Sequence, residues 1–204
     1  MTSLEPKTAA ANFGRIILAV FLGIIVLLMV VFPYLKLSTT ALVALLAVLF
    51  FYFFLKVKFN IKLPIFVLMA LMIGVAVDAL GNYFGFYNRK FGSLWYDNYT
   101  HLIGTAAVAL TFFWLIYDLK LKERIKLSLI AVSIFAFGLT IALASFYEVT
   151  EFWDEIYFGG KRIWGIHDTS RDLEWDMIGA IVGISISLGI LKLRSRKLHN
   201  ERVP

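Results

Sequence analysis

The segment LSLIAVSIFAFGLTIALASFYEVTEFWDE, residues 127–155, decides the fold class. Its first part, residues 127–147, carries no charged side chain, and Glu148 and Glu151 follow directly after it. The hydrocarbon core of a bilayer is about 30 Å thick, and roughly 20 apolar residues in a helix cross it. The segment therefore predicts a transmembrane helix over residues 127–153 that ends among acidic side chains.

Five further stretches have the same apolar character. The last of them is long enough to cross a bilayer only if Asp172 and Asp176 lie in its first turns. The predicted fold class is an all-α polytopic membrane helix bundle, with residues 1–204 forming one integral membrane domain. The six transmembrane helices are expected at about residues 16–35, 37–56, 63–87, 98–118, 127–153 and 172–193.

The composition agrees with this fold class and excludes several others. Of 204 residues, 60% are hydrophobic and 17% are charged, whereas about a quarter of the residues in a soluble domain are charged. The chain has no cysteine, which excludes thiolate metal sites and cysteine nucleophiles. No phosphate-binding or dinucleotide fingerprint is present. The expected partner is the lipid bilayer, and no nucleic-acid partner is expected.

The charged residues predict how the bundle is oriented. Of the 20 lysine and arginine residues, 14 lie on the same side of the predicted helices as the N-terminus. Because cytoplasmic loops carry the excess of basic residues, we expect both termini to be cytoplasmic in a cell-membrane protein. Ten of the 14 acidic residues gather at the opposite, extracytoplasmic ends, together with His101 and His167.

The spacing of these acids predicts a polar site. Residues four apart share one face of a helix, as do Asp97 with His101 and Asp172 with Asp176. Acids at a membrane are costly unless they pair, face a cavity or bind a cation. Carboxylates suit Mg²⁺, Ca²⁺ or Mn²⁺, and an added histidine also suits Zn²⁺ or Fe²⁺. The expected metal ligands are Asp97, His101, Glu148, Glu151, Asp172 and Asp176.

Other residues receive roles around that site. His101 or Glu148 is expected to act as the catalytic base. The expected substrate-binding residues are Arg171, Tyr83 and Trp95, and the expected polar network is Asp78, Asn82 and Asp168. Simpler interpretations stay open: acids at a helix start favour the helix dipole, Arg171 can bridge two acids, and Trp95 can be an interfacial aromatic residue.

The chain resembles the uncharacterised multi-pass inner-membrane family typified by YjdF and, more distantly, the VanZ-like proteins. The resemblance covers about residues 70–190 and implies a six-helix membrane protein with an outer polar pocket, but no reaction. Asn98, Glu151 and Asp176 depart from the VanZ-like pattern. The motifs that carry the resemblance are Asp78-x₂-Gly81-x-Tyr83, Trp95-Tyr96-Asp97-x₃-His101-x₂-Gly104, Phe146-Tyr147-Glu148-x₂-Glu151-Phe152-Trp153 and Asp168-Thr169-x₂-Asp172-x₃-Asp176-x₂-Gly179-Ala180.

Three functions are compatible with these features. The first is a metal-dependent membrane hydrolase or transferase that acts on a lipid or a small molecule of the cell envelope. The second is a non-catalytic accessory protein in which the acids form a structural network. The third is a small ion-coupled transporter, which is less favoured because the acids lie at one end of the helices and not at the midplane. The cofactor is left open, and only the first function calls for a divalent metal.

Overall fold

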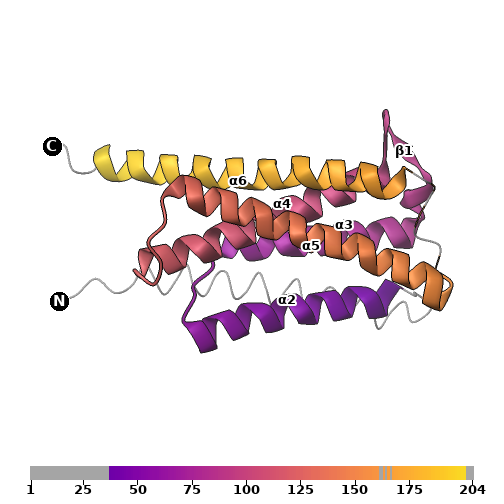
Figure 1. Ribbon diagram of the computed structural model, residues 1–204, viewed down its shortest axis with the longest axis horizontal. Coiled ribbons are helices and arrows are strands. Elements are labelled where there is room, and N and C mark those ends of the chain that lie inside the picture. The colour runs from indigo at the N-terminus through magenta and orange to yellow at the C-terminus, as the bar shows by residue number, and fades with distance from the viewer. Residues whose placement is uncertain (1–36, 161–162, 164, 166, 201–204) are drawn as a thin grey trace.

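The computed structural model describes residues 37–160, 163, 165 and 167–200, and the side chains among residues 47–196 of these. Five long helices run side by side in an elongated bundle (Figure 1). A short 3₁₀ helix and a two-stranded antiparallel hairpin lie at one end of it. The elements are α2 (Leu37–Phe59), α3 (Ile65–Phe84), η1 (Phe86–Asn88), β1 (Lys90–Phe91), β2 (Leu94–Trp95), α4 (Tyr96–Leu121), α5 (Leu129–Phe158) and α6 (Asp168–Asn200).

The predicted all-α membrane fold is confirmed in this part of the chain. Four helices, α3 to α6, are long and apolar enough to cross a membrane. Helix α2 has 23 residues, but its side chains are described only from residue 47. The helix predicted at residues 16–35 lies outside the described residues, so the total of six helices stays a prediction, as does the cytoplasmic position of both termini.

Local sequence explains why two helices begin or end away from the predicted residues. Helix α3 ends at Phe84 and not at residue 87, because Gly85 adopts a left-handed conformation with a φ of 64° that glycine tolerates best. Helix α4 begins at Tyr96 and not at residue 98, because the Asn98 side chain accepts a hydrogen bond from the Trp95 backbone N–H at 2.9 Å. The stretch between these helices forms the hairpin, which was expected only as a connection.

The last two helices are longer than predicted. Helix α5 continues to Phe158, where Gly159 takes a φ of 72° and ends it. Helix α6 begins at Asp168, so the acids predicted for its first turns do lie in the helix. An acid in the first turn is favoured by the helix dipole. Acidic residues are therefore part of both helices at the end where they meet.

Helix α4 is the centre of the bundle and packs against α3, α5 and α6. Small residues allow the closest approaches. A Cβ in place of the Gly179 hydrogen would stand 2.6 Å from the Leu102 carbonyl oxygen, and one on Gly74 would stand 3.4 Å from the Gly104 Cα. Elsewhere in the bundle, Phe113 and Val132 are fully buried. The packing of α6 on α4 thus depends on glycine at the contact.

The outer faces of the helices are apolar. Helix α5 exposes Ile130, Ile134, Phe135 and Phe146 along its length. Soluble monomers rarely expose apolar surface of this extent. Since the helices also have the length of membrane spans, this apolar surface is suited to contact with lipid.

Candidate functional site

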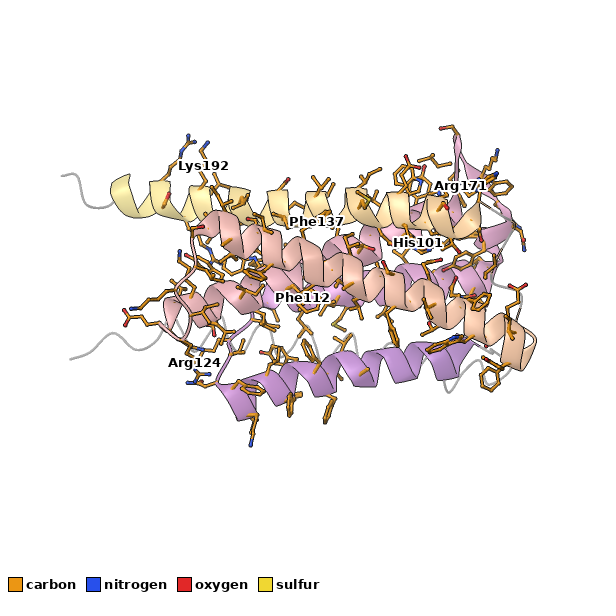
Figure 2. The ribbon with its side chains drawn as sticks, viewed as in Figure 1. His101, Phe112, Arg124, Phe137, Arg171 and Lys192 are labelled. Carbon is orange, nitrogen blue, oxygen red and sulfur yellow. The ribbon has the colours of Figure 1, made fainter. Side chains whose placement is uncertain are left out.

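One histidine and four acids form a cluster inside the bundle. We call it the His101 cluster; its members are Asp97, His101, Glu148, Asp172 and Asp176. Three helices contribute to it: α4, α5 and α6. In Figure 2, His101 lies between the helices toward the hairpin end, whereas Arg124 and Lys192 lie at the other end.

Distances show that the four acids surround one imidazole. The Nε2 atom of His101 lies 3.7 Å from Oδ1 of Asp97, 3.8 Å from Oδ1 of Asp172 and 4.0 Å from Oε1 of Glu148. Its Nδ1 atom lies 3.1 Å from Oδ1 of Asp176. Four carboxylates around one imidazole leave an excess of negative charge at the end of a membrane-spanning bundle, where such charge is costly.

Most of the cluster is shielded from solvent. The side chains of Glu148 and Asp172 are each 4% exposed and that of His101 is 10% exposed, whereas that of Asp97 is 27% exposed. Oε1 of Glu148 and Oδ1 of Asp172 are buried and have no hydrogen-bond partner. An unpaired buried carboxylate oxygen is costly, so these two atoms are the unsatisfied polar groups of the cluster.

Thr105 completes the contact between α4 and α6. Its hydroxyl donates a hydrogen bond to Oδ1 of Asp176, the same oxygen that His101 Nδ1 approaches. Thr105 was not among the expected site residues. The signal for it was present in the sequence, because it follows His101 by four residues and so shares its helix face.

Asp78 and Asn82 belong to a separate polar group on α3. The Asn82 amide donates to Oδ1 of Asp78 at 3.3 Å, and the Tyr87 hydroxyl donates to the same oxygen. Burial, followed by the Asp78 charge, raises the pKa of Tyr87 above its usual value. Tyr87 also lies next to Thr100, whose hydroxyl donates to the Asp97 backbone carbonyl at 2.7 Å and approaches Oδ1 of Asp97 at 3.3 Å. The Asp78 group therefore lies beside the His101 cluster, with Thr100 between Tyr87 and Asp97.

Two expected members lie next to the cluster. Asp168 is buried at the first turn of α6 and interacts electrostatically with Asp97 and Asp172. Glu151 is half-buried one turn after Glu148 on α5 and interacts electrostatically with it. The expectation that Glu151 ligates a metal stays a prediction.

The expected substrate-binding residues lie outside the cluster. Arg171 is exposed, and Figure 2 places it on the outer side of α6, away from His101. Trp95 is exposed in the hairpin, with the Lys90 ammonium 4.8 Å from its ring centre, which suits an interfacial aromatic residue. Tyr83 is exposed near the end of α3, against Phe84. His167 is exposed before α6 begins.

The donor atoms of the cluster are arranged so that they could hold a cation. Asp97, His101 and Asp172 offer three ligand atoms that all lie within 4.8 Å of one another, and His101, Glu148 and Asp176 form a second such group. Imidazole nitrogen and carboxylate oxygen together suit Zn²⁺, Mn²⁺ or Fe²⁺. The described residues thus offer one mixed nitrogen and oxygen site centred on His101.

Comparison with known proteins supports the membrane assignment. Residues 14–194 match the model of a family described as Predicted membrane protein (DUF2238). No curated protein and no solved structure matches the chain. The family fits the expected resemblance in its general form, an uncharacterised family of membrane proteins, while the YjdF-like and VanZ-like resemblance stays a prediction.

Proposed function

The chain belongs to the DUF2238 family of membrane proteins, and we propose that it is a divalent-metal-dependent enzyme. Its substrate is a lipid or a small molecule of the cell envelope. One observation carries the proposal: two buried carboxylate oxygens without hydrogen-bond partners, on Glu148 and Asp172, lie 4.0 and 3.8 Å from the same imidazole nitrogen.

A cation at the cluster explains how the acids can lie so close together. It would supply the positive charge that four carboxylates need, and the ion with its bound water would give the two unpaired oxygens partners. A divalent ion also brings the pKa of a bound water toward neutrality and neutralises a phosphate. The reaction class is hydrolysis: the water oxygen forms a bond to phosphorus or to a carbonyl carbon, and the leaving group departs with a proton.

The place of the cluster in the bundle suggests the substrate class. The cluster lies at the end opposite Arg124 and Lys192, and the excess of basic residues assigns that other end to the cytoplasm. The cluster then faces the extracytoplasmic side at the depth of lipid headgroups. Asp97, the most exposed member of the cluster, marks the side from which a headgroup would enter.

A structural role is the competing function. It is favoured by the contact of Asp176 with both His101 and Thr105, because these hydrogen bonds tie α6 to α4 without any ligand. In an accessory protein of this kind, neutral replacements in the cluster would reduce stability and would change no turnover.

Metal analysis of the detergent-purified protein tests the proposal. We expect about one equivalent of divalent metal per chain in the wild type and none in Asp172→Asn. Glu174→Gln is the matched control, because Glu174 is exposed on the same helix, and it should keep the metal. The absence of metal from the wild type after incubation with Zn²⁺, Mn²⁺ and Fe²⁺ would reject the enzyme and leave the structural role. A screen of lipid phosphates and lipid esters then identifies the substrate.

A further inference from the structure

We infer that the members of the His101 cluster have three different roles in one metal centre. Asp97, His101 and Asp172 ligate a transition-metal ion, Glu148 accepts a proton from water bound to that ion, and Asp176 orients the imidazole. The inference rests on the proposed function and specifies how its site is built.

The assigned ligands are the two carboxylate oxygens that lie nearest to Nε2 of His101. This atom lies 3.7 Å from Asp97 and 3.8 Å from Asp172, and the three donor atoms lie within 4.8 Å of one another. Ligands that share one ion are held about 3 to 4 Å apart, because each lies about 2.0 to 2.2 Å from it. A ligand set of one imidazole and two carboxylates favours Zn²⁺, Mn²⁺ or Fe²⁺ over Ca²⁺.

The other ring nitrogen shows why Asp176 is not a ligand. Nδ1 of His101 lies 3.1 Å from Oδ1 of Asp176, and that oxygen also accepts a hydrogen bond from the Thr105 hydroxyl. A histidine that binds a metal usually donates its second ring N–H to a carboxylate, which fixes the tautomer and the ring orientation. Asp176 is thus a positioning residue that leaves the lone pair of Nε2 free for the ion.

Glu148 is the member of the cluster that α5 contributes, whereas the three ligands come from α4 and α6. Its Oε1 atom is buried, lacks a hydrogen-bond partner and lies 4.0 Å from Nε2. A water bound to the ion on this side would lie within hydrogen-bond reach of Oε1. Glu148 would accept the proton of that water as the water oxygen bonds to the substrate, and it would pass the proton to the leaving group.

Cobalt substitution separates the three roles without knowledge of the substrate. Co²⁺ replaces the ion and reports its surroundings by visible absorption. We expect Asp97→Asn and Asp172→Asn to lose Co²⁺ binding. Asp176→Asn should still bind about one equivalent, with an affinity about 10- to 100-fold lower. Glu148→Gln should bind Co²⁺ as tightly as wild type, but the pH-dependent spectral change caused by ionisation of bound water should move to higher pH.

The possible failures are distinguishable. If Asp176→Asn loses Co²⁺ as completely as Asp172→Asn, then Asp176 is a ligand and the assignment of roles is wrong, although the metal-dependent function stands. If Glu148→Gln abolishes Co²⁺ binding, then Glu148 is a ligand, and again only the assignment of roles is wrong. If the wild type binds no Co²⁺, the proposed function itself is wrong. Should Asp176→Asn not fold, Thr105→Val removes only the supporting hydroxyl and should lower the affinity several-fold, whereas Thr105→Ser should keep it.

Discussion

Gly179 of α6 lies directly against the backbone of Leu102 in α4. A Cβ on Gly179 would stand 2.6 Å from the Leu102 carbonyl oxygen and 3.1 Å from the Thr105 Cβ. Leu102 follows His101 in the sequence, and Gly179 follows Asp176 by three residues. The close approach of the two backbones is therefore what brings Asp176 within 3.1 Å of His101.

Gly179→Ala is expected to push α6 away from α4 and to destabilise the bundle by about 1–3 kcal/mol, as overpacking does in a tight core. Thermal unfolding in detergent measures the loss. Gly189→Ala is the matched control: Gly189 lies on the same helix, with nothing within 4 Å of an added Cβ. Equal stability of the two variants would show that the glycine contact does not determine the helix spacing.

The sequence predicts the helices and only part of the site, and the reason is physical. Apolar length alone identifies a membrane span, so α3 to α6 could be expected. Spacing of i, i+4 identifies pairs on one helix, such as Asp97 with His101. Spacing within one helix does not show which helices pack against one another. The cluster depends on the contact at Gly179, so the separation of Asp168 from Asp78 and Asn82 could not be predicted, nor could the exposure of Arg171.

Arg171 provides a test of substrate binding that is independent of the metal. Its side chain is exposed and points away from His101, so Arg171→Ala should leave the melting temperature and the Co²⁺ affinity of the protein unchanged. If Arg171 binds an anionic headgroup, the variant should raise KM and leave kcat unchanged. A loss of Co²⁺ binding in Arg171→Ala would show that the arginine supports the metal centre itself.

The opposite end of the bundle holds a second contact that can be tested separately. The Arg124 guanidinium donates a hydrogen bond to the Phe59 carbonyl at 2.9 Å, and the Lys122 ammonium reaches the Asn60 carbonyl. These bonds tie the loop after α4 to the C-terminus of α2. Arg124→Ala should cost about 0.5–1.5 kcal/mol, measured by thermal unfolding, and should leave Co²⁺ affinity unchanged.

Lys126→Ala is the control for that experiment, because Lys126 is exposed in the same loop. It removes the same charge at the membrane surface. If Lys126→Ala destabilises the protein as much as Arg124→Ala does, the effect comes from the loop charge and not from the bond to Phe59.

Tyr87 is expected to make the stability of the protein fall in alkali. Burial and then the Asp78 charge raise its pKa in the folded protein above the ordinary value of 10.0. Below pH 10 the folded and the unfolded chain both carry the Tyr87 phenol proton, so the contribution of Tyr87 to the stability of the fold is fully present. Above about pH 10 the unfolded chain loses the proton while the folded chain keeps it, and stability decreases as pH rises.

The comparison of wild type with Tyr87→Phe isolates this contribution from those of the other tyrosines. At pH 7 the variant should be about 1 kcal/mol less stable, because the hydrogen bond to Asp78 is lost. Between pH 10 and pH 11 its melting temperature should decrease less steeply than that of wild type. Parallel pH curves for the two proteins would mean that Tyr87 ionises equally in both states. Burial and the Asp78 charge would then not raise the pKa of Tyr87 in the folded protein.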